Sequence, residues 1–181
     1  MVTKAKAAFL DRDGVINKNI IINGAPCPPE ESEQVEILDG VVEAIVLLKA
    51  HGYTSIVITN QPDVARGKTT LREVTKINIK IKELTKIDNF YVCVHDDVHN
   101  CECRKPKPGL IMRATKDLNI DLKSSFLIGD RWRDIQAGQN CGLNSYFIDH
   151  NYMESPPVQP FKRVKSLLEA VELELGINRD E

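Results

Sequence analysis

The sequence lacks an apolar run of the length that a membrane span requires, so no membrane-embedded segment is expected. Near its start, charged residues are followed by the short run Ala7–Leu10, which is too short for the apolar region of a signal peptide. Positive charge is not in excess, because 24 basic side chains face 26 acidic ones, for a net charge of −2. Without a general positive field, neither nucleic acid nor a membrane is expected as a partner.

Cysteine is too scarce, and odd in number, for a secreted disulfide scaffold. The chain has 5 cysteines in 181 residues, and Cys93, Cys101 and Cys103 lie in one short segment. Disulfide scaffolds are shorter and have an even number of cysteines. We therefore expect a reduced, cytoplasmic protein in which the clustered cysteines bind metal or lie buried as thiols. Cys27 and Cys141 are interpreted as ordinary thiols.

The length and a hydrophobic content of 42% are sufficient for one domain with its own core, which we expect over residues 1–181. Short apolar runs alternate with segments of helical periodicity. The expected strands are Ala7–Leu10, Ser55–Thr59, Phe90–Val94, Ser125–Ile128 and Ser145–Ile148. The expected helices are Val41–Leu48, Leu71–Leu84, Ile111–Leu118 (with Pro108 in its first turn), Trp132–Gln139 and Val164–Leu175. This alternation predicts an α/β fold, a doubly wound, Rossmann-like parallel sheet with helices on both faces.

Two segments interrupt the alternation. Asn17–Asp39 contains several prolines and an acidic run, and we expect a hairpin or loop that covers the mouth of the sheet. The other segment contains the clustered cysteines. The intervals after Asp13 and after Thr59 are too short for a large cap domain, so a bulky substrate could reach the site.

Two acidic residues, Asp11 and Asp13, directly follow the first predicted strand. At a strand end both carboxylates point into one crevice, where each raises the pKa of the other unless a cation lies between them. The pair therefore favours a divalent metal. The alternative is a simple turn with Gly14 at its tip. An EF-hand is excluded, because Gly14 comes too early and Ile22 stands where the bidentate Glu should be.

Further polar groups follow the next strands or precede the third helix. They are Thr59, Asn60, Gln61, Arg104, Lys105, Asp130 and Asp134. Each has an ordinary alternative, such as a strand end for Thr59 or a solvated charge for Lys105. Together, two acid pairs, a hydroxyl and a lysine are what metal-assisted phosphoryl transfer through an aspartyl intermediate requires.

The cysteine segment holds the ligand types of a zinc site. Cys93, His95, Cys101 and Cys103 supply three thiolates and one imidazole, which suit tetrahedral Zn²⁺ in a closed, structural site. His99 is the competing nitrogen ligand, and buried thiols without metal are the alternative. We expect zinc to stabilise this loop and thereby to hold Arg104 and Lys105, which follow it in the sequence, over the site.

In their order along nearly the whole chain, these motifs resemble those of the haloacid dehalogenase superfamily. The resemblance implies that Asp11 is the nucleophile and Asp13 the general acid and base. It further implies that Thr59 hydrogen-bonds the phosphoryl group and that Lys105 pairs with the nucleophile and the phosphate. An aspartate at position 13 is typical of a phosphatase rather than a dehalogenase.

The same resemblance implies a catalytic Mg²⁺. Asp11, Asp130 and the backbone carbonyl of Asp13 would hold it, and Asp134 would support its ligands. The cysteine loop and Cys103–Pro106 resemble the zinc-bearing branch of the superfamily, which contains phosphatases of heptose bisphosphate and of histidinol phosphate.

Within that branch, Asp11–Asn17, Thr59–Gln61 and Ala65–Lys68 are closer to the heptose enzymes, whereas the short spacer between His95 and Cys101 is closer to the histidinol enzymes. Two departures leave the substrate open: Pro62–Val64 replaces a turn of small residues, and Asn17–Asp39 is longer than its counterpart. The resemblance implies that the substrate-binding residues are Asn60, Gln61, Arg66, Arg104 and Arg131.

The expected function is removal of the 7-phosphate of D-glycero-D-manno-heptose 1,7-bisphosphate or a related sugar bisphosphate, within heptose biosynthesis for lipopolysaccharide. The expected protein is a monomer with a small phosphorylated sugar as substrate. Three alternatives stay open: a histidinol-phosphate phosphatase, a polynucleotide 3′-phosphatase, and a non-catalytic zinc-stabilised interaction module. His51 and His150 have no catalytic neighbours and are expected to cap an element or lie on the surface.

Overall fold

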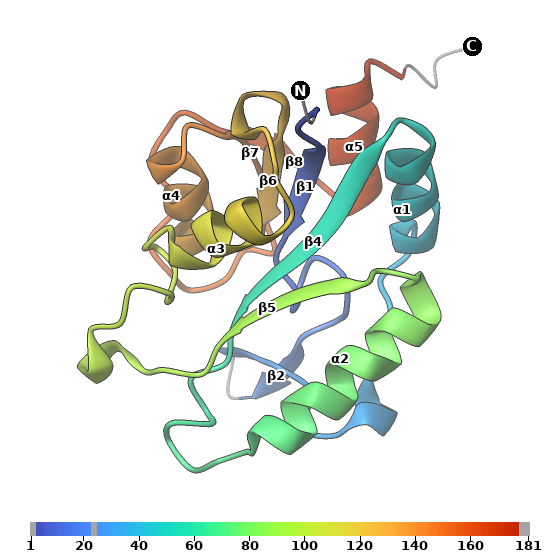
Figure 1. Cartoon of the computed structure of the whole chain (residues 1–181). Coiled ribbons are helices and arrows are strands. Elements are labelled where there is room, and N and C mark those ends of the chain that lie inside the picture. Colours follow the sequence, from blue (N-terminus) through green and yellow to red (C-terminus); the bar gives the residue numbers. More distant parts are fainter. Residues whose placement is uncertain (1–2, 23–24, 178–181) are drawn as a thin grey trace.

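The computed structural model describes residues 3–22 and 25–177, and its centre is a six-stranded parallel sheet (Figure 1). The strand order is β5-β4-β1-β6-β7-β8. The strands are β1 (Lys6–Leu10), β4 (Tyr53–Asn60), β5 (Asn89–Cys93), β6 (Phe126–Gly129), β7 (Asn144–Ile148) and β8 (Lys162–Val164). From β1 the chain builds outward to β5 and then returns to β6 on the other side of β1. The carboxyl ends of β1, β4 and β6 therefore border the crevice where such folds bind their ligands.

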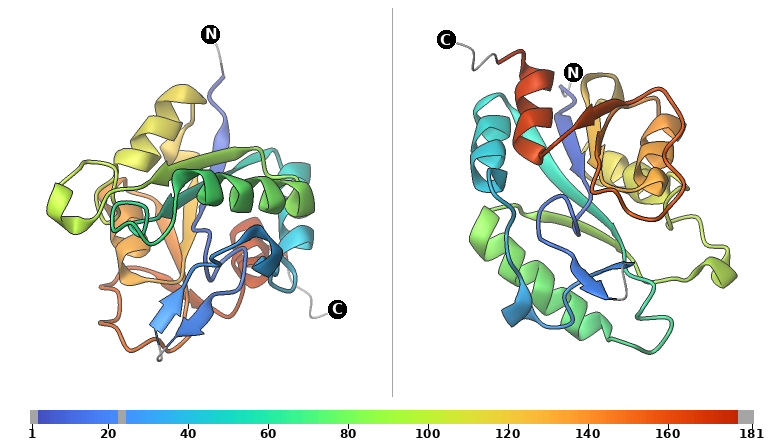
Figure 2. Two further views of the ribbon diagram at one scale, coloured as in Figure 1. Left: turned by 90° about the horizontal axis from the view of Figure 1, so that it is seen from below. Right: turned by 180° about the vertical axis from the view of Figure 1, so that it is seen from behind.

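Five helices cover the two faces of the sheet. They are α1 (Val41–Ala50), α2 (Leu71–Thr85), α3 (Gly109–Asp117), α4 (Trp132–Asn140) and α5 (Leu167–Leu175). Helices α1, α2 and α5 pack on one face, and α3 and α4 pack on the other (Figures 1 and 2). The predicted doubly wound α/β fold with helices on both faces is thus confirmed. No helix in the described ranges combines the length and the apolar character of a membrane span.

Side chains of β1 alternate between two hydrophobic cores. Ala8 and Leu10 belong to the core under α1, α2 and α5, whereas Ala7 and Phe9 belong to the core under α3 and α4. All four side chains are completely buried. Because a strand covered on both faces has no solvent side, its sequence is a continuous apolar run. This is why the short run before Asp11 was recognisable in the sequence.

The segment 17–39 contains a hairpin, which is one of the two forms, hairpin or loop, expected from the sequence. Strands β2 (Ile20–Ile22) and β3 (Ala25–Cys27) pair antiparallel, and the 3₁₀ turn η1 (Ser32–Gln34) follows. The connecting residues 23–24 lie outside the described part of the chain. The backbone N–H of Leu38 donates to the carbonyl of Ile16 at 2.9 Å, which ties the end of this segment to the turn after β1.

The C-terminal helix begins later than predicted. Val164 lies in β8, an edge strand in which it pairs with Ile148 of β7, and it is buried against the sheet. Helix α5 starts at Leu167, after Ser166, whose hydroxyl accepts the backbone N–H of Glu169 at 3.2 Å. The apolar spacing of Val164 mimicked a helix, but the serine N-cap ends the strand and starts the helix.

Pro108 also differs slightly from the prediction. It is the N-cap of α3, one position before the first helical residue Gly109, rather than a residue of the first turn. A proline at this boundary has no backbone N–H to leave unpaired, which explains why it is tolerated there.

Helix α2 offers a matched test of the core. Ile81 is fully buried, whereas Ile79 on the same helix is 51% exposed. We expect Ile81→Ala to lower the free energy of unfolding by about 2–5 kcal/mol, because it removes buried methyl groups and leaves a cavity. Ile79→Ala is expected to change it by less than about 0.5 kcal/mol. Urea unfolding of both variants measures this difference, and equal losses would contradict the packing of α2.

Candidate active site

A cavity of about 360 Å³ opens at the carboxyl edge of the sheet. Asp11 follows β1, Thr59 lies near the end of β4, and Asp134 lies in the first turn of α4 after β6. The hairpin contributes Cys27 to the opposite wall. The parallel topology thus gathers residues that are distant in the sequence into one cavity.

Lys105 occupies the centre of this edge. Its Nζ donates to Asp11 Oδ1 at 2.6 Å and to the carbonyl of Ile58 at 2.7 Å, and it lies 2.6 Å from Asp134 Oδ1. Burial alone would lower the pKa of Lys105, but the two adjacent carboxylates outweigh it and raise the pKa above its ordinary value. The lysine is therefore a fixed positive charge against Asp11.

Three buried carboxylates converge beside this lysine. Ligand oxygens of Asp11, Asp130 and Asp134 all lie within 4.8 Å of one another. Burial, followed by the charge of Asp134, raises the pKa of Asp11 to about 6. Burial and the charges of Asp11 and Asp134 raise the pKa of Asp130 well above its ordinary value. One lysine does not neutralise three acids, so the site favours an additional cation.

Asp130 itself fits a cation ligand. Its Oδ1 is buried and has no hydrogen-bond partner among the described residues. Its Oδ2 accepts from the hydroxyl of Tyr152 at 3.0 Å and from Asn19 Nδ2 at 3.4 Å. Gly14 is necessary here, because a Cβ at its position would lie 1.9 Å from Asp130 Oδ2. Hard oxygen ligands with one unpaired buried oxygen suit Mg²⁺.

Asp13 is held by a side chain that the sequence analysis did not identify. The completely buried Arg12 donates to both carboxylate oxygens of Asp13, with Nη2–Oδ2 at 2.9 Å, and its Nη1 donates to Asn78 of α2 at 3.0 Å. Gln61 Nε2 also donates to Asp13 Oδ2 at 2.8 Å. An arginine between two acids is visible in the sequence, but the burial of its side chain and the direction in which it points are not.

The predicted substrate-binding amides line the cavity, yet both bond to other residues of the site. Asn60 accepts the backbone N–H of Lys105 and donates to its carbonyl, both at 3.1 Å. Gln61 Nε2 donates to Thr59 Oγ1 at 2.8 Å as well as to Asp13. Asn60 therefore fixes the backbone that carries Lys105.

The predicted cations all reach the cavity wall, and each has an acidic partner. Arg66 donates to Asp96 from Nε at 2.7 Å, and Arg131 pairs with Glu154. Two further cations of the wall, Lys68 and Arg133, were not predicted from the sequence. The full set of cations that line the cavity is Arg66, Lys68, Arg104, Lys105, Arg131 and Arg133.

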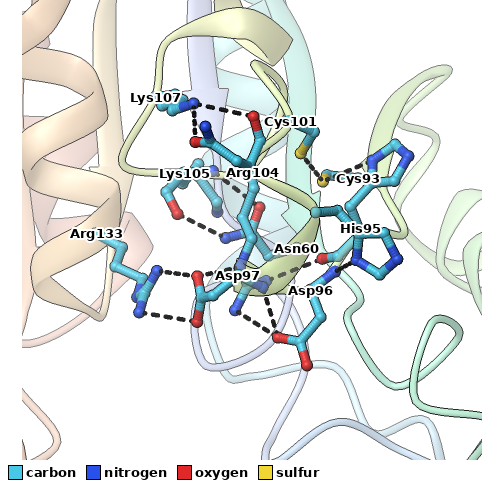
Figure 3. A network of polar contacts seen from close by, with 12 residues as sticks. Asn60, Cys93, His95, Asp96, Asp97, Cys101, Arg104, Lys105, Lys107 and Arg133 are labelled. Carbon is cyan, nitrogen blue, oxygen red and sulfur yellow. Dashed lines mark hydrogen bonds and ion pairs between the residues drawn. The ribbon is translucent and has the colours of Figure 1, made fainter.

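The four predicted zinc ligands come together in the loop after β5. Figure 3 labels three of them, Cys93, His95 and Cys101. Cys103 Sγ lies 3.1 Å from Cys93 Sγ and 3.4 Å from Cys101 Sγ, and His95 Nδ1 lies 3.2 Å from Cys103 Sγ. Ligands at about 2.3 Å from a tetrahedral zinc are separated by about 3.8 Å, close to this arrangement.

The competing ligand His99 is not part of this cluster. Its Nδ1 accepts the backbone N–H of Asp96 at 3.2 Å and caps the short turn η2 (Asp97–His99). Three sulfurs and one imidazole nitrogen, converging in a loop between β5 and α3, fit a structural Zn²⁺.

The two remaining histidines have structural contacts. His51 is the C-cap residue of α1, with Nδ1 at 2.9 Å from the carbonyl of Leu47. His150 Nε2 lies 2.7 Å from the carbonyl of Gly14, so it joins the segment after β7 to the turn beside Asp130. Of the two unclustered cysteines, Cys27 lines the cavity, whereas Cys141 is the C-cap residue of α4.

The raised pKa of Asp11 predicts a pH dependence of stability without metal. The folded protein holds a proton at Asp11 up to about pH 6, whereas the ordinary value is 3.8. The contribution of this proton to the stability of the fold is complete below the ordinary pKa and is lost as the pH rises through about 6. In EDTA, we therefore expect Asp11→Asn to gain stability over the wild type as the pH rises from about 4 to about 8, by up to about 3 kcal/mol.

Thermal unfolding across that pH range measures the difference. Asp117→Asn, at an exposed acid of α3, controls for the loss of one negative charge. A wild-type advantage that grows toward high pH would contradict the electrostatics of the three carboxylates.

Comparisons with known proteins agree with this geometry. Residues 28–148 match the family model of the haloacid dehalogenase-like hydrolases. A D-glycero-beta-D-manno-heptose-1,7-bisphosphate 7-phosphatase of Helicobacter pylori J99 is 38% identical over 163 residues, which cover 86% of this chain and 90% of that protein. A D-glycero-alpha-D-manno-heptose-1,7-bisphosphate 7-phosphatase of Campylobacter jejuni is 35% identical over 173 residues, which cover 91% of this chain and 95% of that protein.

A solved structure shares the fold. The D,D-heptose 1,7-bisphosphate phosphatase from B. bronchiseptica, complexed with magnesium and phosphate, superposes with a TM-score of 0.83 at 24% identity, covering 94% of this chain and 98% of that one. The fold, the family and the phosphatase class predicted from the sequence are confirmed. The chain belongs to the haloacid dehalogenase-like hydrolases.

Proposed function

We propose that the protein is a Mg²⁺-dependent phosphatase that removes the 7-phosphate of D-glycero-D-manno-heptose 1,7-bisphosphate. The observation that carries this proposal is the position of Asp11, whose carboxylate faces a cavity lined by cations and is paired with a buried lysine. The names of the relatives from Helicobacter pylori and Campylobacter jejuni support the substrate. Because they name both the beta and the alpha anomer, they do not favour one.

In the first step, a carboxylate oxygen of Asp11 attacks the phosphorus, and the bond from phosphorus to the sugar oxygen breaks. Asp13 donates a proton to that leaving oxygen. Lys105, 2.6 Å from Asp11 Oδ1, keeps the nucleophile ionised and stabilises the negative charge of the phosphoryl group. Thr59, which lines the same cavity, would hydrogen-bond a phosphoryl oxygen.

In the second step, water opens the acyl phosphate on Asp11, and Asp13 accepts the proton of that water. Arg12 and Gln61 donate to its oxygens and fix the position of this carboxylate. Products are the free sugar hydroxyl and inorganic phosphate.

The three converging carboxylates would hold the metal. Asp11 and Asp130, together with the backbone carbonyl of Asp13, would supply its ligand oxygens, and Asp134 would support them. When bound, Mg²⁺ supplies positive charge to the transferring phosphoryl group. The magnesium and phosphate in the structure of the B. bronchiseptica enzyme support this assignment.

The cysteine cluster would hold a structural Zn²⁺ through Cys93, His95, Cys101 and Cys103. Cys103 is two residues before Lys105, and Asn60 clamps the Lys105 backbone from β4. When zinc is bound, these four residues would hold the loop in place and, through it, the backbone of Lys105.

Charge at the cavity favours a sugar bisphosphate over histidinol phosphate. Histidinol phosphate carries a cationic amine and an imidazole, which require acids such as Glu31 or Glu33. Neither is among the residues that line the cavity in the described part of the chain. Four arginines line it together with two other acids, Asp63 and Asp97, and the guanidiniums suit a second phosphate.

The remaining predictions stay as predictions. They are a monomeric, cytoplasmic enzyme that forms one domain over residues 1–181. The ends of that range, residues 1–2 and 178–181, lie outside the described residues. The non-catalytic and 3′-phosphatase alternatives lack a favouring observation.

Removal of the nucleophile tests the mechanism. Asp11→Asn is expected to lower kcat by about 10³-fold or more, because the amide cannot form the acyl phosphate. Phosphate release from heptose 1,7-bisphosphate with Mg²⁺ measures this, and thermal unfolding confirms that the variant is folded.

Asp117→Asn on α3 is the matched control and should retain activity. Turnover of Asp11→Asn close to that of the wild type would refute the covalent mechanism. If the wild type instead prefers histidinol phosphate by kcat/KM, the mechanism stands and the sugar substrate is wrong.

Metal analysis tests the cysteine cluster. We expect about one Zn²⁺ per purified chain, and a loss of more than half of it in Cys103→Ser, because a hydroxyl is a poor zinc ligand. Cys141→Ser, at a cysteine outside the cluster, should retain the full content. Elemental analysis by mass spectrometry measures both. Wild-type protein free of zinc after expression with zinc supplied would argue for buried thiols.

A further inference from the structure

Three arginines from separate elements reach the outer wall of the cavity. Arg66 follows β4, Arg104 lies in the cysteine loop, and Arg133 lies in α4. All three pair with two neighbouring acids of that loop, Asp96 and Asp97. Figure 3 shows the two acids beside Arg104 and Arg133. The acids belong to the short spacer between the predicted zinc ligands, so the cysteine loop places negative charge directly on the arginines of the cavity.

Asp97 binds two of these arginines, Arg104 and Arg133. Its Oδ1 accepts from Arg104 Nε at 2.8 Å and from Arg133 Nη1 at 2.9 Å, and its Oδ2 lies 3.4 Å from Arg133 Nη2. The carboxylate therefore occupies the two terminal nitrogens of Arg133, the part of a guanidinium that binds phosphate. The side chain of Asp97 is 56% exposed, so it lies at the boundary between cavity and solvent.

The two acids differ in what else they hold. Asp96 Oδ1 accepts the backbone N–H of Asp97 at 2.7 Å and so caps η2, in addition to binding Arg66. Among the described residues, the carboxylate of Asp97 accepts hydrogen bonds from Arg104 and Arg133 alone. Release of Asp97 from the arginines therefore breaks no bond of the turn.

We propose that the carboxylate of Asp97 takes the place of the second phosphate of the substrate, the one that is not hydrolysed. In the free enzyme its carboxylate keeps Arg104 and Arg133 together, and it gives way when that second phosphate binds them. This inference rests on the proposed function, because it requires a substrate with two phosphates.

The charges explain why a phosphate displaces Asp97 and weaker groups do not. A phosphate monoester carries about −1.5 to −2 charges at neutral pH and three acceptor oxygens, compared with −1 charge and two oxygens for a carboxylate. A hydroxyl or a single amide offers no charge to the arginines. Asp97 therefore keeps uncharged groups off the two arginines, at the expense of some affinity for a bisphosphate.

The test compares one substrate pair in matched variants. Asp97→Asn keeps the size of the side chain and removes its charge. We expect it to raise the ratio of kcat/KM for heptose 1,7-bisphosphate to that for heptose 7-phosphate at least about threefold, through a lower KM for the bisphosphate. Glu102→Gln removes a charge from the same loop at a side chain that is 86% exposed and pairs with Lys107, and it should leave the ratio unchanged.

A second variant guards against a trivial effect on the loop. Arg133→Gln should lower the same ratio, and adding Asp97→Asn to it should raise the ratio less than in the wild-type background. A ratio that stays constant or falls in Asp97→Asn, with thermal unfolding unchanged, overturns the inference alone. A wild-type enzyme that hydrolyses neither sugar overturns the proposed function, and the inference with it.

Discussion

The ion pair between Lys105 and two buried acids is the contact on which the rest of the site depends. The Nζ of Lys105 lies 2.6 Å from a carboxylate oxygen of Asp11 and 2.6 Å from one of Asp134, and all three side chains are buried. Removing one partner of a buried pair leaves an uncompensated charge, which is costly. The surplus of negative charge that remains after this pairing is what makes the edge of the sheet a place for a cation.

That dependence explains why so many elements lie around one lysine. The loop with the cysteine cluster carries Lys105, and Asn60 at the end of β4 holds its backbone from both sides. Asp134 is fixed in turn, since its Oδ2 accepts the backbone N–H of Arg131 at the start of α4. Lys105 and Asp134 are therefore held by the ends of a strand and a helix and not by flexible loops alone.

The sequence was sufficient to predict the sheet, its helices and the groups at the strand ends. Apolar runs followed by Asp, Thr or Gly-Asp mark those ends, so the strand pattern alone brings Asp11, Thr59 and Asp130 to one edge of the sheet. The edge strand β8 was missed because three residues give little periodicity, and the apolar Val164 matched the spacing of the next helix.

Contacts between distant side chains were not predictable in the same way. Arg12 follows Asp11 in the sequence, yet its guanidinium reaches Asn78 on α2, and Asp97 meets Arg133 from another element. Such pairs depend on rotamers and on how α2 and α4 sit against the sheet. A charge pattern indicates that arginines and acids are present, but not which of them meet.

The hairpin of β2 and β3 has a consequence for how this enzyme can diversify. It forms its own two-stranded sheet, separate from the six-stranded one, and it supplies Pro26, Cys27 and Pro28 to the cavity wall. Its length and side chains can change without removing a hydrogen bond from the central sheet. The hairpin residues that line the cavity can therefore change while β1 and β4, which bring Asp11 and Thr59 to the same cavity, keep their pairing.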